Sequence, residues 1–142
     1  MSDLQRALEI AVTVHKGQVQ KSGAPYVLHP LRLMFSVDSE EEKIAALLHD
    51  VVEDTDWELA GLKAEGFSQE VIDAIDCLTH QEGVDYEVYI NKIAGNALAR
   101  AVKLADLRDN MNIIRLPKVN EQALDRINKY HKAWLKLGGD ID

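Results

Sequence analysis

Apolar residues recur at the helical period along almost the whole chain, and no segment shows the strict alternation expected of a half-buried strand. The chain has 142 residues, the size of one ordinary domain, and 46% of them are hydrophobic. It contains only 8 Gly and 3 Pro, so turn-forming residues are too few to suggest a disordered or low-complexity protein. We therefore predict an all-α fold in which residues 1–142 form a single compact domain, a bundle of about seven helices.

The charge balance excludes several classes of partner. The chain carries 16 basic and 24 acidic residues, a formal net charge of −8, so it has no basic excess to neutralise a nucleic-acid backbone. No apolar run reaches the roughly 18 residues of a membrane span, and the first residues lack the pattern of a secretory signal. Cys77 is the single cysteine and forms no internal disulfide. We expect a cytoplasmic protein with no nucleic-acid or membrane partner, and homo-oligomerisation stays open.

Two polar residues interrupt the most apolar of the predicted helices, which spans residues 40–54. His49 and Asp50 stand within a run that is otherwise apolar on all sides and should be buried. Burial of an unpartnered carboxylate destabilises the folded state by roughly several kcal/mol. Asp50 therefore needs a cation or a set of hydrogen bonds. Glu53 and Asp54 follow at helical spacing and bring two more carboxylates to neighbouring faces. Such a cluster predicts a divalent metal ion among these groups.

A second polar interruption lies later in the chain. Asp106 falls in the apolar-rich segment 101–107, and Asp109 and Asn110 share its helical face. His29 is a further candidate, because it directly precedes a turn proline. Taken alone, Asp109 is expected at the surface.

One metal site explains most of these anomalies together, and its four predicted ligands are His29, His49, Asp50 and Asp106. Two imidazoles with two carboxylates suit Mn, Fe, Co, Ni or Zn better than an all-oxygen calcium cage. Such an ion can polarise a phosphoryl oxygen and activate water. The plainer interpretation of His49 alone is a hydrogen-bonded core histidine.

The order of these motifs resembles the HD superfamily of metal-dependent phosphohydrolases, which are all-helical. Three segments carry the resemblance: HKGQVQKSGAPYVLHP at 15–30, AALLHDVVEDT at 45–55 and VKLADLRDNM at 102–111. Over residues 4–116 the chain looks like the hydrolase domain of Rel/Spo enzymes and like the single-domain small alarmone hydrolases. The resemblance implies a stand-alone hydrolase that removes pyrophosphate from the 3′ position of guanosine tetra- or pentaphosphate, written (p)ppGpp.

The resemblance also assigns roles to individual residues. The four ligands would hold one divalent metal ion, typically Mn²⁺. Glu53 and Asp54 match the acidic pair that orients and deprotonates the attacking water. Asn110 matches a substrate-contacting position. The loop that embraces the nucleoside in the family corresponds here to Lys21, Ser22 and Tyr26.

Lys103 lies within the last motif and is expected to help neutralise a small anionic nucleotide.

Departures from the family pattern leave the substrate open. Gln20 stands where the family usually has an arginine that packs on the guanine base, and Ala24 replaces a common glutamate. Leu107 and Asn112 replace residues that are commonly basic. The metal machinery is present while the base-reading positions differ. Two alternatives follow: an HD phosphohydrolase that acts on another nucleotide or dinucleotide phosphate, and a nucleotide-binding sensor without catalytic turnover.

Overall fold

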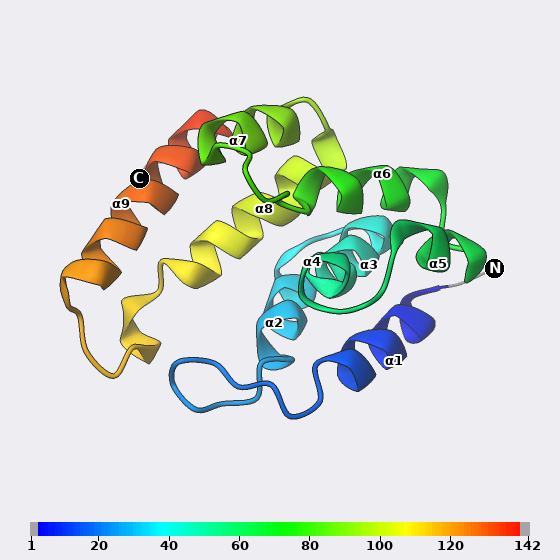
Figure 1. The fold of residues 1–142 in the computed structure, drawn as a ribbon, viewed down its shortest axis with the longest axis horizontal. Coiled ribbons are helices and arrows are strands. Elements are labelled where there is room, and N and C mark those ends of the chain that lie inside the picture. The colour runs from blue at the N-terminus through cyan, green and yellow to red at the C-terminus, as the bar shows by residue number, and fades with distance from the viewer. Residues whose placement is uncertain (1–2, 140–142) are drawn as a thin grey trace.

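The computed structural model describes residues 3–139, and within this range every regular element is helical (Figure 1). The elements are nine α-helices and one short 3₁₀-helix, η1. In chain order they are α1 (Leu4–Val14), α2 (Leu28–Ser36), α3 (Glu40–Leu48), α4 (Val51–Asp54), α5 (Leu59–Ala64), α6 (Gln69–Leu78), α7 (Tyr86–Ala94), α8 (Ala97–Asn110), η1 (Ile113–Arg115) and α9 (Glu121–Lys136). The prediction of an all-α fold is confirmed, with more helices than the about seven expected.

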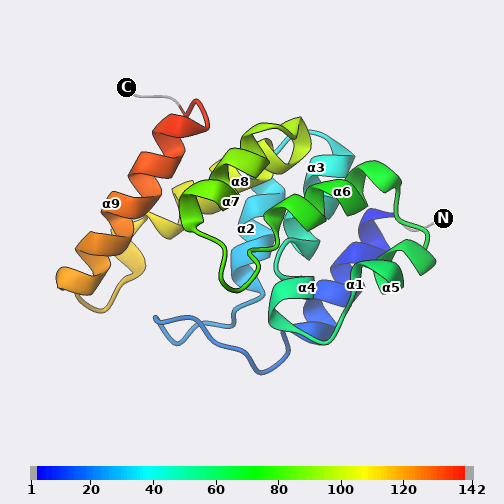
Figure 2. The same ribbon diagram turned by 45° about the horizontal axis from the view of Figure 1, so that its top comes forward.

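Helices α3 and α8 form the centre of the bundle. Helix α3 packs against α1, α2, α6 and α8, and α8 packs against α2, α3, α6, α7 and α9. Figures 1 and 2 both place α9 at one end of the molecule and α1 with α5 at the other. Segments far apart in the sequence therefore meet along α3 and α8, and this arrangement brings the sequence-predicted ligands together.

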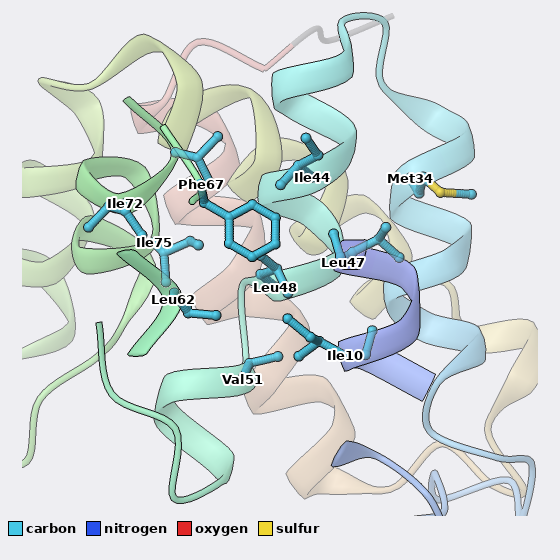
Figure 3. Close-up of a cluster of buried hydrophobic side chains, with 13 residues drawn as sticks. Ile10, Met34, Ile44, Leu47, Leu48, Val51, Leu62, Phe67, Ile72 and Ile75 are labelled. Carbon is cyan, nitrogen blue, oxygen red and sulfur yellow. The ribbon is translucent and has the colours of Figure 1, made fainter. Parts of the chain in front are cut away.

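Two clusters of buried apolar side chains fill the space around the central helices. Figure 3 shows the first cluster, in which Leu47 and Leu48 of α3 face Ile10 of α1 and Phe67, which precedes α6. Both leucines are fully buried. The second cluster surrounds α8 and includes side chains from α6, α7 and α9. The apolar face that the helical period predicts on each segment is what these clusters bury.

Side-chain caps determine where the two central helices begin. The Ser39 hydroxyl accepts a hydrogen bond from the Glu42 backbone N–H, and the Glu42 carboxylate accepts one from the Ser39 N–H, which completes a capping box at the start of α3. The Asn96 side chain accepts from the Ala99 N–H at the start of α8.

The predicted helix over residues 40–54 is divided, and this expectation was wrong. Helix α3 ends at Leu48, and α4 begins at Val51. The His49 ring donates through Nδ1 to the backbone carbonyl of Ala46 at 2.6 Å. This contact occupies a carbonyl that would take part in the ladder of a continuous helix. The break therefore lies at the His49–Asp50 pair, and the spacing argument that treated Glu53 and Asp54 as members of the same helix no longer applies.

Within residues 3–139, no helix has both the length and the apolar character needed to cross a membrane.

Truncation of the core of α3 should destabilise the protein strongly. Leu47 of α3 is fully buried in the cluster that α3 shares with α1. Leu47→Ala is therefore expected to lower the free energy of unfolding by about 2–5 kcal/mol. Chemical denaturation followed by circular dichroism measures the change. Leu124→Ala on α9 is the control: that side chain is 51% exposed, and its loss should change stability by no more than about 0.5 kcal/mol. Equal effects in the two variants would contradict this assignment of the core.

Candidate metal centre

Three of the four sequence-predicted ligands form one cluster. His29 lies in the first turn of α2, while His49 and Asp50 occupy the break between α3 and α4. One potential ligand atom from each of these residues lies within 4.8 Å of the other two. Both histidine rings are almost completely buried, and their centroids are 5.4 Å apart in an edge-on arrangement. The break in the helix thus presents two adjacent ligands to a third from another helix.

Asp106 joins this cluster from α8. Its Oδ1 lies 2.8 Å from His29 Nε2 and 3.6 Å from His49 Nε2. Its Oδ2 accepts a hydrogen bond from Lys103 Nζ at 2.9 Å. The carboxylate is buried, with a residue exposure of 5%, so it depends on these partners for its ionised form.

The tautomer of His49 indicates what the cluster can bind. A carbonyl only accepts hydrogen bonds, so the contact to Ala46 requires the proton on Nδ1. In the neutral ring Nε2 then carries a lone pair, and this atom is buried without a hydrogen-bond partner. It lies 3.0 Å from Asp50 Oδ2, within ion-pair distance but without hydrogen-bond geometry. A lone pair directed among carboxylates fits a divalent cation, and the mixed imidazole–carboxylate set suits a transition metal.

The electrostatics of the cluster favour positive charge at its centre. Burial alone would lower the pKa of His49, but the negative charges of Asp50 and Asp106 outweigh it and raise the pKa well above the ordinary value. Burial likewise opposes the charged form of His29, yet its hydrogen bonds to Asp106 and Asp109 raise the pKa. Burial would raise the pKa of Asp106, but the neighbouring Lys103 and the histidines hold it well below its usual range. A bound ion would need the histidines neutral, so protons and metal compete here.

Three residues expected to touch substrate contact the carboxylates of two predicted ligands, Asp50 and Asp106. The Tyr26 hydroxyl donates a short hydrogen bond to Asp50 Oδ2. The Asn110 amide donates to Asp106 Oδ1 at 3.1 Å, alongside the Lys103 contact to the same carboxylate. All three also line the adjoining cavity, so each can both hold a ligand and face a bound molecule.

Asp109 is the residue that the sequence interpretation missed. It was expected at the surface, but its side chain is only 12% exposed. Its Oδ2 lies 2.6 Å from His29 Nδ1, and both carboxylate oxygens accept hydrogen bonds from Arg32. Arg115 of η1 also reaches the carboxylate, at 3.0 Å. The available signal was its place one helical turn after Asp106, on the same face of α8.

The predicted acidic pair, Glu53 and Asp54, lies beside the cluster at the end of the single turn of α4. Glu53 lines the cavity, and its Oε1 accepts a hydrogen bond from the His80 backbone N–H at 2.6 Å. Glu53 is exposed as a whole, but partial desolvation beside the cluster raises the pKa of its carboxyl, and the charges of Asp50 and Asp54 raise it further. Asp54 is not among the residues that line the cavity. Its pKa is also raised, first by burial and then by Asp50.

A cavity of about 680 Å³ opens above the cluster, a volume suited to a small-molecule ligand. The loop after α1 forms one wall, including Gln20, Lys21 and Ser22. The loop turns back on itself through an isolated bridge between Val19 and Pro25. Other walls come from α7, α8, η1 and α9, whose cavity-lining residues include Tyr86, Tyr89, Arg115, Arg126, Lys129 and Tyr130.

Sequence comparison relates the chain to part of several larger proteins. No protein-family model matches it. It is 33% identical over 136 residues to a probable GTP pyrophosphokinase of Mycobacterium leprae, a match that covers 87% of this chain and 17% of that protein. It is 34% identical over 141 residues to a guanosine-3′,5′-bis(diphosphate) 3′-pyrophosphohydrolase of Borreliella burgdorferi, over 87% of this chain and 20% of the relative. A bifunctional (p)ppGpp synthase/hydrolase RelA of Mycobacterium tuberculosis is 34% identical over 136 residues, with 87% and 18% covered.

The chain is homologous to one region of the Rel/Spo proteins. It spans about a fifth of the length of these relatives, from 17% to 20%. A solved structure of a metazoan ortholog of SpoT, described as hydrolysing ppGpp, superimposes with a TM-score of 0.79 at 24% identity. The match covers 96% of this chain and 85% of that one, so the two share a fold over nearly their whole lengths. The Rel/Spo resemblance and the fold predicted from the motifs are confirmed.

Divalent metal should stabilise the folded protein, because the ligand cluster is assembled only in the native state. Mn²⁺ at about 100 times its dissociation constant is expected to add about 2.7 kcal/mol to the free energy of unfolding. Thermal denaturation with and without Mn²⁺ measures the shift. His49→Ala should abolish it, whereas His131→Ala, at an exposed position of α9, should leave it unchanged. A melting temperature that Mn²⁺ does not move in the wild-type protein would contradict the site.

Proposed function

We propose that the chain is a metal-dependent phosphohydrolase that releases pyrophosphate from the 3′ position of (p)ppGpp-type nucleotides. The observation that carries this proposal is the buried His–Asp cluster, with its unpartnered His49 Nε2, lying next to Glu53 at the wall of one cavity. A relative named guanosine-3′,5′-bis(diphosphate) 3′-pyrophosphohydrolase supports the choice of substrate. The shared fold with a ppGpp-hydrolysing protein supports it further.

The proposed metal ligands are His29, His49, Asp50 and Asp106, and Mn²⁺ is the proposed ion. Bound there, the ion would supply Lewis-acid polarisation of the phosphoryl group. The protein's own contribution is orientation of the ligands. Tyr26 holds Asp50 through its hydroxyl, and Lys103 with Asn110 holds Asp106. Hydrogen-bonded ligand carboxylates of this kind keep their orientation when the active site binds substrate.

Glu53 is the proposed general base. Water would add to the phosphorus attached to the 3′ oxygen, the bond between that phosphorus and the 3′ oxygen would break, and pyrophosphate would leave. Glu53 would accept the proton that the water loses, and transfer of one proton from Glu53 or from solvent to the departing 3′ oxygen would complete its hydroxyl. A raised pKa makes a carboxylate a stronger base, and burial together with Asp54 raises that of Glu53. Asp54 would therefore act through Glu53 rather than on the substrate, since it does not line the cavity.

The distribution of positive charge supports a substrate with phosphates at two ends. Lys21 on the loop, together with Arg126 and Lys129 on α9, lines the cavity, and none of the three is paired with a carboxylate among residues 3–139. The cations nearer the cluster are already neutralised, Lys103 by Asp106 and Arg115 by Asp109. Unpaired cations remote from the metal ligands suit a second anionic group, as in a nucleoside carrying both 5′ and 3′ phosphates.

The proposed partner is thus a small anionic nucleotide held in a local basic pocket of an acidic protein. With a net charge of −8, the surface as a whole is unsuited to nucleic-acid polymers. A cytoplasmic location and the possibility of a homo-oligomer remain part of this proposal.

A second candidate keeps the site and changes the base. Gln20 places a neutral amide on the cavity wall, where the family resemblance leads us to expect an arginine against guanine. The chain could then hydrolyse another nucleotide or dinucleotide phosphate. A sensor that binds nucleotide without turnover is the non-enzymatic alternative.

Hydrolysis of ppGpp tests the main proposal. The purified protein with Mn²⁺ is expected to convert ppGpp into GDP and pyrophosphate. Chromatography of the nucleotides measures this conversion. Glu53→Gln should lower kcat by about 10²- to 10⁴-fold, because the general base is lost, without abolishing Mn²⁺ binding. Glu82→Gln, in the exposed loop before α7, is the matched control and should retain full activity.

Parallel assays of other nucleotides separate the candidates. An Mn²⁺-loaded protein that leaves ppGpp intact but hydrolyses a different nucleotide favours the second candidate. Tight nucleotide binding with no product after long incubation favours the sensor.

The activity should be lost as the pH is lowered, with a midpoint above the pKa of an unperturbed glutamate. Glu53 must be ionised to accept a proton, and its pKa is raised first by burial and then by Asp50 and Asp54, while the His80 N–H and Lys103 oppose the shift. As the pH falls through this raised pKa, Glu53 is protonated and kcat should decline. The profile is measured at saturating Mn²⁺ and ppGpp, so that loss of metal does not contribute. The residual activity of Glu53→Gln should lack this limb. If it persists there, another group is responsible.

A further inference from the structure

Asp109 joins three elements around one metal-ligand histidine. It lies on α8, accepts a hydrogen bond from His29 Nδ1 at 2.6 Å, and is bound through both oxygens by Arg32 of α2, at 2.8 and 3.0 Å. Arg115 of η1 reaches Asp109 Oδ1 at 3.0 Å and donates to the Asp109 backbone carbonyl as well. The carboxylate is therefore satisfied on every side by donors, and none of these contacts is to the cavity cations on α9.

Two guanidinium groups and one imidazole nitrogen surround this carboxylate. An ionised carboxylate only accepts hydrogen bonds. With a proton on His29 Nδ1, the 2.6 Å contact to Asp109 Oδ2 is therefore a hydrogen bond that the ring donates.

The other nitrogen of His29 is the one that faces the ligand cluster. His29 Nε2 lies 2.8 Å from Asp106 Oδ1, and a neutral histidine has only one ring proton. If the proton sits on Nδ1, Nε2 presents a lone pair to the cluster. If it sits on Nε2, the ring donates to Asp106 and has no lone pair there. His29 can act as a metal ligand through Nε2 only if the ring donates its single N–H to Asp109 and not to Asp106.

We propose that Asp109, fixed by Arg32 and Arg115, is a positioning residue that holds His29 in its Nδ1-protonated tautomer and so makes Nε2 available to the metal. This rests on the metal site proposed above and assigns a role to a residue outside the ligand set. Metal-ligating histidines generally orient themselves by donating their second N–H to a carboxylate or carbonyl. His49 does this with the Ala46 carbonyl, and His29 does it with Asp109.

Metal affinity measured without substrate tests this role. Mn²⁺ binding is followed by electron paramagnetic resonance of the free ion, for the full chain. Asp109→Ala is expected to weaken binding by about 10- to 100-fold. Asp109→Asn should weaken it less, because its amide oxygen can still accept from Nδ1. Asp38→Asn removes the same charge from the exposed turn between α2 and α3 and should bind Mn²⁺ like the wild type.

A spectroscopic signature separates positioning from general destabilisation. In protein loaded with Zn²⁺ as a diamagnetic probe, ¹⁵N NMR of the histidines should show His29 protonated at Nδ1 and metal-bound at Nε2. Asp109→Ala should lose this pattern while His49 keeps its own. A folded Asp109→Ala that retains both the wild-type Mn²⁺ affinity and the His29 pattern would overturn the proposal.

Further variants keep the test decisive if Asp109→Ala does not fold. Arg32→Gln leaves Asp109 in place but removes its bidentate partner, and it should weaken Mn²⁺ binding in the same direction as Asp109→Asn. Unchanged affinity in both variants would overturn the proposal. Because no substrate is present, a wild-type protein that binds Mn²⁺ but does not hydrolyse ppGpp would refute the proposed function alone.

Discussion

The buried carboxylate of Asp106 is the constraint around which the centre of the molecule is organised. Burial of an isolated ionised carboxylate carries a large desolvation penalty, and only close positive and hydrogen-bonding partners offset that penalty. Lys103 and Asn110 donate to it from the same helix, and His29 of α2 lies 2.8 Å from it. His49, which follows α3, lies 3.6 Å from the same carboxylate. Helices α2, α3 and α8 therefore meet at one polar point within an otherwise apolar bundle. Loss of Lys103 would leave the charge of Asp106 unbalanced in the interior.

Much of this arrangement can be predicted from the sequence, because polar residues stand in segments that are apolar enough to be buried. The apolar period predicts helices and an all-α fold, and the polar residues that break it identify His49, Asp50 and Asp106 as unusual. The interruption at His49 and Asp50 also marks the end of α3, but a periodic pattern cannot tell a polar residue within a helix from one that terminates it. At this end of α3 the ring of His49 contacts the Ala46 carbonyl, and the direction of a side chain cannot be read from the spacing of residues.

Asp109 shows why the remaining part of the site could not be predicted. Its partner His29 is 80 residues away in the chain, and Arg32 is 77 residues away. Its place one helical turn after Asp106 was the only local signal, and acidic residues at that spacing are also common on exposed helix faces. Tyr26, Lys103 and Asn110 were recognised as important, but their partners were not. Lys103 and Asn110 reach Asp106 within α8, at spacings of three and four residues, whereas the contact of Tyr26 to Asp50 joins residues 24 apart in the chain. The sequence comparisons relate the chain to Rel/Spo proteins as a whole, but the roles of these individual residues stay predictions.

The two ends of the cavity are carried by different parts of the fold. The metal-ligand cluster is built on α2, α8 and the α3–α4 break, deep in the bundle, while Arg126 and Lys129 stand on α9 at its periphery. Helix α9 packs mainly against α8, with a smaller contact to α7 (Figure 2). Changes on its inner face therefore alter what the outer half of the cavity accepts without disturbing the buried charges. A fold of this design can vary in the ligands that it admits through one peripheral helix while the buried polar cluster stays unchanged.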